Sequence, residues 1–600
     1  MPRLGRWFEL PLIISLAMTA GCGQQKDERH SPRQPIQTGS TPPSTDPIST
    51  RESSETQAMD TYPVDRHAIF RECTVERGIT SNADHWPRGT YLAPETGPSG
   101  IALLDFDNDG DLDIYQLCHP PPEPPPSTFA RPAPNRLYRQ EADGRFVEVA
   151  KAVGLDDPGY GYGVAVGDVD NDGDLDVFVT NYGLDTLYLN RGDGTYGRSN
   201  GHFGDDSWST GASFVDYDRD GDLDLFVAQY AQFDPNERCR SQDGYDEFDY
   251  CGPHTFPGMV DRLFENDGQG QFKEISQQAG ITAAARGWGA ICIDLTGDGW
   301  PDIYVANDLE PNQLWVNQHD GTFVDQATLR GVAFNAYGKV EASMGLAAGD
   351  VDQDGLLDLF MTHLSIETNT LYTTLGAGDE AYLDRSNASG MAAVDLPYTG
   401  WGCALFDMDH DQDLDVVVVN GRVARGAIYA GANVGEFWSY YAEPNLLFRN
   451  DGAGRFENVS SEAGRLCDSV EVTRALAVGD LDADGDIDLV ISNIDNTLRI
   501  YENHAPSPES HWLIIRAISQ GRDAIGAQVN LEIQQKSLVG LILPGSSYLS
   551  SHDPRAHFGL GSVDHVESID VLWPTGHRER FSIGDVDRVV VVRQGEGTSE

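Results

Sequence analysis

The sequence predicts an all-β protein: a seven-bladed β-propeller over residues 66–505, followed by a small β-sandwich-like domain over residues 510–595. Three observations lead to this prediction. An Asp-rich stretch recurs seven times, and a run of apolar, β-forming residues follows each copy. The clearest repeats then add two more alternating apolar segments joined by a Gly-containing turn.

The Asp-rich stretches define the repeat. They begin about 50 to 80 residues apart, a spacing typical of repeat architectures. They read DFDNDGDLD (105–113), DVDNDGDLD (168–176), DYDRDGDLD (216–224), DLTGDGWPD (294–302), DVDQDGLLD (350–358), DMDHDQDLD (407–415) and DLDADGDID (480–488). Small residues alternate just before each stretch, as Gly100 and Ala102 do before Asp105. Residues two apart share one face of a strand, so this pattern predicts inner strands crowded around a common axis.

Four strands are expected in each repeat. The Asp stretch joins the first strand to an apolar run such as IYQL or VFVT. Third and fourth strands show best in residues 135–155, 261–281 and 445–465, where DG or GQG steps indicate hairpin turns. The seventh repeat stops before its fourth strand, and residues 69–79 look like the end of that missing strand. We therefore expect the N-terminal segment to close the ring, which removes an open sheet edge.

The spacing D-x-D-x-D-G-x-x-D places carboxylates at positions 1, 3, 5 and 9 of a tight loop, and the Gly supplies a positive φ. A flexible set of oxygen ligands suits Ca²⁺, whereas Mg²⁺ keeps its waters and zinc needs Cys or His. An EF-hand is excluded, because its loop requires a Glu at the twelfth position and flanking helices. A single copy could be an Asp-rich turn without metal. Seven copies with one spacing favour Ca²⁺ sites.

Two of the loops depart from the pattern. Thr296 replaces an Asp in the fourth loop, and Gln412 replaces the Gly in the sixth, which makes the sixth the weakest prediction. The predicted metal ligands are Asp105, Asp107, Asp109 and Asp113; Asp168, Asp170, Asp172 and Asp176; Asp216, Asp218, Asp220 and Asp224; Asp294, Thr296, Asp298 and Asp302; Asp350, Asp352, Asp354 and Asp358; Asp407, Asp409, Asp411 and Asp415; and Asp480, Asp482, Asp484 and Asp488.

Charge restricts the class of partner. Lys and Arg number 41 and Asp and Glu 95, so the formal net charge is −54. A nucleic acid partner is excluded, because phosphate binding needs clustered cations. The natural counterpart of such a chain is a cation.

The N-terminus predicts export. Residues 1–21 form a signal peptide of the lipoprotein type, with a basic start, the apolar run Leu10–Ala20 and the sequence TAGC, which resembles a bacterial lipobox and ends at Cys22. Lipidated Cys22 would anchor the protein to a membrane, periplasmic or at the cell surface; simple secretion is the first alternative and a cytoplasmic start the second. Residues 22–65, rich in Ser, Thr, Pro and Gln, are expected to be a disordered tether. No later segment is long and apolar enough to span a bilayer.

The remaining cysteines fall into two groups. Cys239 and Cys251 bracket a polar loop and are the best disulfide candidates in an exported protein. Cys292 and Cys403 lie in apolar strand patterns and are expected to be buried thiols. The pairing of all the cysteines other than Cys22, Cys239 and Cys251 stays open.

Longer sequence strings carry a resemblance. The Asp stretches with their flanks resemble FG-GAP/VCBS repeats, and other strings look like the ASPIC/UnbV family, related to cartilage acidic protein. These strings are residues 250–253, 299–323, 341–355, 522–529, 545–561 and 571–576. The resemblance covers about residues 65 to 595. It implies a secreted or surface-attached propeller with calcium loops on one face and a C-terminal ASPIC/UnbV domain, but no known reaction.

The strongest match, GSSYLSSHDPRAHFGLG, contains four polar candidates for a site: Tyr548, His552, Arg555 and His557. The alternative, which we favour, is that Tyr548, His557 and Phe558 pack inside a small sheet.

The expected function is a calcium-binding, surface-tethered or secreted module that recognises a glycan or a protein. The alternative is a propeller hydrolase acting on extracellular polysaccharide or lipid. The zinc-site string H-E-x-x-H does not occur, so the sequence favours binding over catalysis and leaves the question open.

Overall fold

A computed structural model describes residues 68–80, 89–97, 99–118, 134–204, 207–241, 248–376, 381–533 and 536–599. All of them belong to one compact unit, Asp65–Glu600. The predicted signal peptide, the tether and Cys22 lie outside these residues. Within the described part of the chain, every helix is too short or too polar to cross a membrane.

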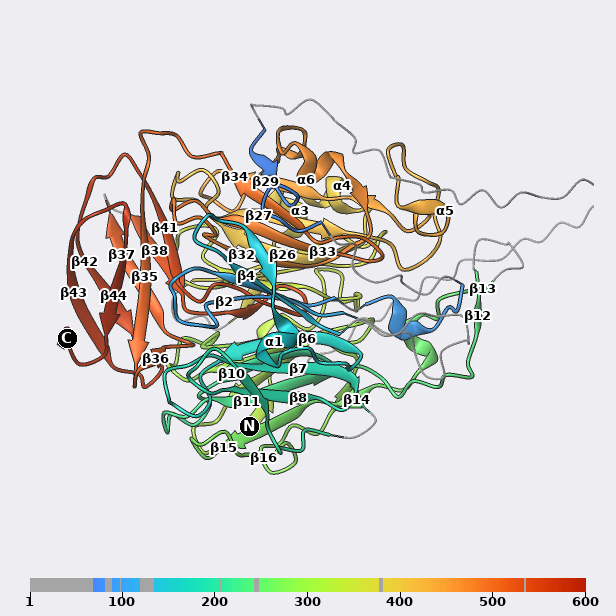
Figure 1. The fold of residues 1–600 in the computed structure, drawn as a ribbon, viewed down its shortest axis with the longest axis horizontal. Helices are drawn as coiled ribbons and strands as arrows, with labels where there is room; N and C mark the ends of the chain where they lie inside the picture. Colours follow the sequence, from blue (N-terminus) through green and yellow to red (C-terminus); the bar gives the residue numbers. More distant parts are fainter. Residues whose placement is uncertain are drawn as a thin grey trace, which may run out of the picture. The chain divides into compact units, whose positions relative to one another are not determined.

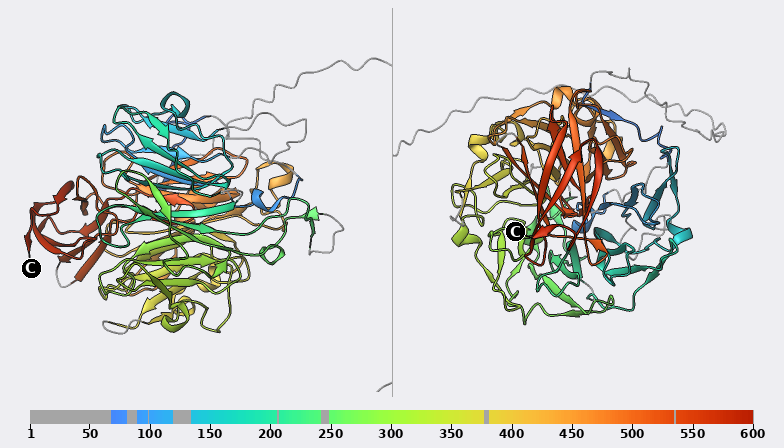
Figure 2. Two further views of the ribbon diagram at one scale, coloured as in Figure 1. Left: turned by 90° about the horizontal axis from the view of Figure 1, so that it is seen from below. Right: turned by 90° about the vertical axis from the view of Figure 1, so that its left-hand side faces the viewer.

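Antiparallel sheets surround a common centre, as the end-on view in Figure 2 shows. The first three are β2 (Ile101–Leu104), β3 (Asp113–Gln116), β4 (Arg136–Gln140) and β5 (Phe146–Glu148); β6 (Gly161–Gly167), β7 (Asp176–Gly183), β8 (Thr186–Asn190) and β9 (Tyr196–Arg198); and β10 (Ser207–Val215), β11 (Asp224–Gln229), β15 (Arg262–Asn266) and β16 (Phe272–Glu274). Pairing of β7 with β10 joins the second sheet to the third.

The other sheets follow the same order. They are β18 (Gly287–Ile293), β19 (Asp302–Asn307), β20 (Gln313–Asn317) and β21 (Phe323–Asp325); β22 (Leu346–Gly349), β23 (Asp358–Met361), β24 (Thr370–Thr374) and β25 (Tyr382–Asp384); β26 (Gly400–Phe406), β27 (Asp415–Asn420), β29 (Leu446–Asn450) and β30 (Phe456–Asn458); and β32 (Thr473–Gly479), β33 (Asp488–Asn493), β34 (Arg499–Asn503) and β1 (Phe70–Glu72). The predicted all-β fold and its propeller arrangement are confirmed.

The small residues before each Asp stretch lie where the inner strands meet. A Cβ atom on Gly211 would lie 2.7 Å from the carbonyl oxygen of Trp288, and one on Gly289 would lie 2.7 Å from that of Met344. Real Cβ atoms do not come so close to a backbone, so glycine at these positions lets each inner strand approach the next.

The N-terminal strand closes the ring. Strand β1 pairs with β34 in antiparallel fashion, with Phe70 opposite Asn503. The prediction that residues 69–79 complete the last repeat is therefore confirmed. Closure between the two ends of a repeat array protects the edge that an open array would expose.

Short elements occupy the connections. The small sheets are β12 (Cys239–Arg240) with β13 (Phe248–Asp249), β14 (Met259–Val260) with β17 (Ala284–Ala285), and β28 (Glu443–Pro444) with β31 (Val470–Glu471). The helices are α1 (Ala150–Val153), α2 (Ala327–Arg330), α3 (Ser386–Ser389), α4 (Ala392–Asp395), α5 (Gly435–Trp438), α6 (Arg465–Asp468) and the 3₁₀ turns η1 (Ala93–Glu95), η2 (Pro253–Thr255) and η3 (Ser460–Glu462). Figure 1 places β12, β13 and α5 on the side of the propeller away from the C-terminal sheets.

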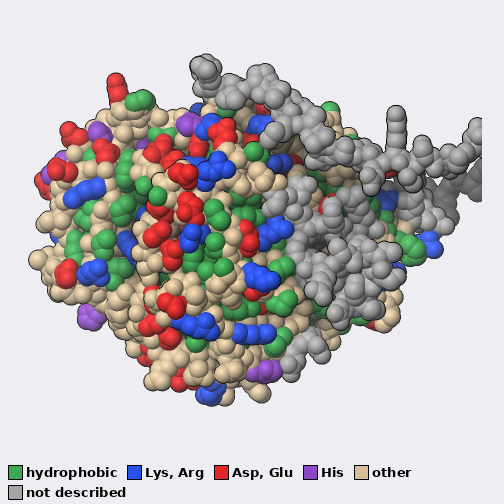
Figure 3. Space-filling view, in the orientation of Figure 1, with side chains coloured by type: hydrophobic (Ala, Val, Ile, Leu, Met, Phe, Trp, Pro, Cys, Tyr) green, Lys and Arg blue, Asp and Glu red, His purple; other side chains and the backbone are tan. Residues whose placement is uncertain are grey.

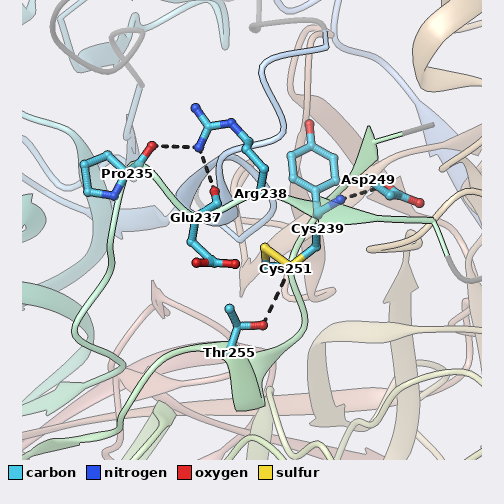
Figure 4. The surroundings of a disulfide bond; sticks show 8 residues. Pro235, Glu237, Arg238, Cys239, Asp249, Cys251 and Thr255 are labelled. Carbon is cyan, nitrogen blue, oxygen red and sulfur yellow. Dashed lines mark hydrogen bonds between the residues drawn. A yellow bond between two sulfur atoms is a disulfide. The ribbon is translucent and has the colours of Figure 1, made fainter. Parts of the chain in front are cut away.

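The described cysteines form one disulfide, and the others lie in the protein interior. Cys239 and Cys251 form a disulfide beside Thr255 (Figure 4). The other described cysteines are buried: Cys73, Cys118, Cys292, Cys403 and Cys467. Burial raises the pKa of Cys292 to about 12, so its thiol stays protonated and inert at neutral pH.

The C-terminal residues form two packed sheets. One contains β35 (His511–Ser519), β36 (Arg522–Asp523), β41 (Ala556–Gly561) and β44 (Arg588–Arg593); the other contains β37 (Gln528–Ile533), β38 (Lys536–Leu541), β42 (His565–Leu572), β43 (Arg578–Asp585) and β45 (Thr598–Ser599). A shared core that includes Leu513, Val529 and Trp573 lies between them. The predicted sandwich-like domain is confirmed, and it lies against one side of the propeller (Figure 2, left).

One C-terminal segment leaves this sandwich and enters the propeller. Strand β40 (Ser550–Ser551), which pairs with β39 (Gly545–Ser546), also pairs in parallel with β2. Tyr548, between them, is fully buried, and its ring centroid lies 4.8 Å from that of Trp401 and 5.7 Å from that of Trp288. Its hydroxyl donates to the carbonyl oxygen of Gly97 at 2.6 Å.

The favoured prediction for the C-terminal motif was therefore only partly right. Phe558 does pack inside the C-terminal core. Tyr548 instead packs among aromatic side chains from several propeller sheets. His557 lies 2.9 Å from the carbonyl oxygen of Gly485, and His552 accepts the N–H of Val478, so both contact the propeller. A short apolar pattern predicts burial, but it carries no information about which distant residues bury it.

Candidate metal centres

Each Asp loop joins the first two strands of its sheet. The carboxylate at position 1 organises the loop: in five loops its two oxygens accept backbone N–H groups from positions 5 and 6. In the fourth loop, Asp294 accepts them from positions 4 and 6. In the first loop, Asp105 accepts the N–H of Asp109 at 3.0 Å and that of Gly110 at 3.1 Å. Gly110 has a φ of 98°, the left-handed conformation for which the sequence pattern reserves a glycine.

The carboxylate at position 9 ties the loop to the sheet. In the first loop, Asp113 accepts the N–H of Phe106 at 3.2 Å and that of Gln140, on the third strand, at 2.8 Å. The same pair of bonds recurs in the other loops. Position 9 is therefore held in place by the backbone before any ion arrives.

In several loops one carboxylate oxygen is left without a partner. At position 3, one buried oxygen each of Asp107, Asp170, Asp352 and Asp409 has no hydrogen-bond partner among the described residues, and in the third loop the same holds for Asp216 at position 1. In the fourth loop the buried hydroxyl oxygen of Thr296 is in the same condition. A buried acceptor without a partner costs roughly 1–3 kcal/mol, so a recurring one indicates a missing ligand at that point.

Carboxylates at positions 1, 3 and 9 converge. In each group below, one oxygen per residue lies within 4.8 Å of the others. The groups are Asp105, Asp107 and Asp113; Asp168, Asp170 and Asp176; Asp216, Asp218 and Asp224; Asp350, Asp352 and Asp358; and Asp407, Asp409 and Asp415. Oxygen donors at this separation, with one acceptor left open, fit a metal ion.

The carboxylate at position 5 takes part in the turn of its loop. Asp109 does not belong to the group of the first loop, and its oxygen accepts the N–H of Asp111 at 3.0 Å. The equivalent bond recurs in every other loop. A side chain engaged two residues further on stabilises the turn itself. Its part in metal binding stays a prediction.

Burial raises the pKa of these carboxyl groups. The pKa of Asp113 and of Asp176 rises to about 8, and that of Asp224 to about 9, chiefly because burial penalises the charged form and further because the other carboxylates of each loop repel it. A bound cation would remove both penalties, since it replaces lost solvation with direct charge contacts.

The sixth loop forms in spite of its missing glycine. Gln412 adopts the positive φ itself, 80°, and its side-chain amide donates to the carbonyl oxygen of Leu560 in the C-terminal sandwich at 2.9 Å. This anchor offsets the strain that a non-glycine residue carries there. The three carboxylates of the loop converge as in the others. Arg449 also contacts Asp409, with Nε 3.1 Å from the carboxylate oxygen.

Neighbouring loops are linked through residues that the sequence analysis missed. Asn190, at the end of a third strand, donates its side-chain N–H to the carbonyl oxygen of Phe106 in the preceding loop at 3.0 Å. Asn266, Asn317, Asn450 and Asn503 make the equivalent bond. The sequence does contain a signal for these links, because an Asn recurs at the end of the third strand of most repeats.

A second set of links joins position 4 of one loop to position 7 of the next. Asn108 donates to Asp174 at 2.7 Å, and Asn171 donates to Asp222 at 2.8 Å. These bonds link the first loop to the second and the second to the third. The aspartates of the loops together form an acidic band. Figure 3 shows this band where the propeller meets the C-terminal sheets.

The C-terminal sandwich rests on the loops. Arg522 donates to the side chain of Asn171 at 2.9 Å and to the carbonyl oxygen of Gly221 at 2.6 Å. Lys536 lies 3.2 Å from Asp413. Of the predicted polar candidates in the C-terminal motif, Arg555 pairs with Asp553 at 2.6 Å, beside the last loop. Tyr548, His552 and His557 of the same motif bond to the propeller, so the motif serves the contact between the C-terminal domain and the propeller.

Comparison with known proteins supports the resemblance. Residues 518–599 match the family described as ASPIC and UnbV. The description FG-GAP-like repeat matches residues 128–179, 168–227, 242–305 and 294–361. The chain is 25% identical over 492 residues to cartilage acidic protein 1 of Mus musculus, covering 80% of this chain and 70% of that protein. The Homo sapiens protein is 25% identical over 501 residues, with 80% and 69% covered. The predicted family resemblance is confirmed.

Solved structures show weaker likeness. An Agrocybe aegerita lectin that recognises non-reducing terminal N-acetylglucosamine aligns with a TM-score of 0.34 and 14% identity over 67% of this chain and 93% of its own. YCF48 bound to D1 peptide aligns with a TM-score of 0.38 and 8% identity, covering 74% and 97%. A Bacillus licheniformis rhamnogalacturonan lyase gives 0.34 and 13%, covering 72% and 76%. Scores this low carry no argument about this chain.

Proposed function

We propose that this chain, which carries FG-GAP-like repeats and a C-terminal ASPIC and UnbV segment, is a Ca²⁺-dependent binding module for a protein or a glycan. One observation carries the proposal: in five loops the carboxylates at positions 1, 3 and 9 converge, and one carboxylate of each group keeps a buried oxygen that has no partner within the described residues. An ion at this point would satisfy that oxygen and offset the charge of the group.

Ca²⁺ fits the donors better than other ions. The groups offer only oxygen, whereas zinc prefers Cys and His ligands. Mg²⁺ demands a near-ideal octahedron and gives up its waters reluctantly, so it is poorly suited to several convergent carboxylates. In the proposed role Ca²⁺ is structural: it neutralises the acidic band and so holds the loops and the C-terminal sandwich together.

The binding role is supported by the connections on the propeller side away from the C-terminal sandwich. There, Arg422 lies over the ring of Tyr429 at 4.6 Å, and Arg425 lies over those of Tyr91 and Tyr440 at 5.5 and 5.9 Å. Tyr and Arg are enriched in interfaces because each combines a large contact area with polar groups. The hydrolase alternative stays a prediction from the sequence.

A ligand screen tests recognition. The full chain, solubilised in detergent, should capture a specific glycan or protein on a glycan array or in a pull-down with millimolar Ca²⁺, and should lose it in EGTA. Specific capture that is equal in both conditions would contradict the Ca²⁺ requirement. An array and a pull-down that are both empty with Ca²⁺ present would contradict the binding role.

The pH dependence of stability should change with metal. Between the usual pKa of about 3.9 and the raised values, the metal-free folded state holds more protons than the unfolded state, so its stability falls as pH rises. Ca²⁺ needs ionised carboxylates, so its stabilising effect grows with pH. We therefore expect Ca²⁺ to raise the Tm more at pH 8 than at pH 5.5. Equal shifts at both values, measured on chelator-stripped protein, would contradict this account.

Export and anchoring belong to the same proposal, with a signal peptide at 1–21, lipidation at Cys22, a tether at 22–65, a propeller at 66–505 and a C-terminal domain at 510–595. The motivation is the apolar run that ends in TAGC. Globomycin should cause the precursor to accumulate, and Cys22→Ser should release the protein from the membrane fraction. If neither globomycin nor Cys22→Ser changes the processing and localisation of the protein, lipidation at Cys22 is ruled out.

A further inference from the structure

A cleft lies between the first two Asp loops and the C-terminal sheet of β35 and β44. Its volume is about 170 Å³, and apolar side chains of the two propeller sheets line much of it. Asp105 and Asp168 line the propeller side, and Arg516, Val589 and Val591 line the C-terminal side. Asp523 and Asp553 also line the cleft, and they pair with Arg516 and Arg555. Val589 is 42% exposed and Val591 48%, a large fraction for valine in a strand, so the cleft opens to solvent.

Strand β44 forms an open edge beside this cleft. It pairs with β35 in parallel, from Arg588 opposite Leu513 to Arg593 opposite Ile518, and no other strand of the described residues pairs with it. The alternate valines, such as Val592, pack into the sandwich core. An apolar edge strand with outward N–H and C=O groups can accept a further strand, and folded proteins usually cover or charge such edges.

Arginines surround this edge although the chain as a whole is acidic. Arg588 and Arg593, at the two ends of β44, are both exposed, and neither forms an ion pair within the described residues. Arg516, opposite Val591, pairs with Asp523 at 2.7 Å and keeps 40% of its side chain exposed. This charge suits an acidic partner, since opposite charge guides encounter and fixes register.

We infer that the edge of β44 binds an extended acidic peptide segment of a partner protein. The segment adds a strand beside β44, its backbone bonds to the outward groups, and alternate side chains enter the cleft, as in other strand-addition complexes. Its carboxylates lie near Arg588, Arg593 and Arg516. The inference rests on the proposed function in one respect: Asp105 and Asp168 repel an acidic segment until a cation offsets their charge.

An end-blocked, fluorescein-labelled peptide of alternating Glu and Val tests the site by fluorescence anisotropy with the full chain. Saturable binding is expected in Ca²⁺, with affinity reduced about tenfold by Val591→Glu and by the double change Arg588→Glu/Arg593→Glu. The peptide with N-methylated alternate amides should bind at least about tenfold more weakly, because strand addition uses its backbone. A peptide of alternating Lys and Val is attracted by the acidic surface as a whole, so any binding it shows should not be weakened by Val591→Glu.

Val324→Glu is the matched control, since Val324 is 49% exposed and lies on β21, the outer strand of the fourth sheet. Equal loss in both valine variants, or no saturable binding, would overturn the inference. Calorimetric titration with Ca²⁺ alone separates the proposed Ca²⁺ sites from the proposed peptide site. Ca²⁺ uptake without peptide binding would contradict only the peptide site at β44. Binding that survives metal removal but is lost in Val591→Glu keeps the site and overturns its Ca²⁺ dependence.

Discussion

Removing Ca²⁺ should lower the melting temperature of the protein markedly, and excess Ca²⁺ but not Mg²⁺ should restore it. Sites of the extracellular type bind at about 10⁻⁴–10⁻³ M. At a free concentration about ten times the dissociation constant, each independent site adds about 1.4 kcal/mol. Five such carboxylate groups would then contribute about 7 kcal/mol, comparable with the whole stability of many domains.

Single loops give the controls for this measurement. Asp107→Asn should remove about one site's share, because Asp107 belongs to the convergent group and has a buried oxygen without a partner in the described chain. Asp109→Asn alone should matter less, since Asp109 serves the turn. The double change Asp107→Asn/Asp109→Asn should cost more than Asp409→Asn/Asp411→Asn, because Arg449 already neutralises part of Asp409. Melting curves that superimpose in EGTA and in millimolar Ca²⁺ would show the loops to be acidic turns without structural metal.

Tyr548→Ala should be among the most destabilising single substitutions in the chain. The side chain is fully buried among propeller aromatics, and truncation of a large buried ring typically costs about 3–5 kcal/mol. Tyr548→Phe keeps the ring and loses only the hydrogen bond to Gly97, so we expect about 1 kcal/mol. Urea unfolding with Ca²⁺ present measures both values.

Tyr337→Ala provides the comparison, because Tyr337 is 75% exposed and should tolerate truncation with little change. If Tyr548→Ala costs no more than this control, the C-terminal segment does not stabilise the propeller. Because the sandwich also bonds to the loops through Arg522 and Gln412, the Tyr548 variant should retain some of that contact. Loss of the contact between the sandwich and the propeller should be measurable as faster limited proteolysis between residues 505 and 510.

Much of the fold could be predicted because its signals are local. Apolar alternation predicted the strands, and the Asp spacing placed each loop between the first two. Positions 1, 3 and 9 converge as expected in five loops, since a tight turn brings them together whatever surrounds it. The spacing alone did not reveal that Asp109, at position 5, accepts a backbone N–H from two residues further on.

The sequence by itself determined the repeat, the strand order, the closing strand at residues 69–79 and the family resemblance, because each depends on patterns within a few residues. Only the tertiary structure decided where the C-terminal motif goes and why the sixth loop tolerates Gln412. Tyr548 bonds to Gly97 across 451 residues of sequence, and Gln412 bonds to Leu560 across 148. Such contacts arise only when the sheets close around their axis, so no local pattern encodes which distant side chain fills the space.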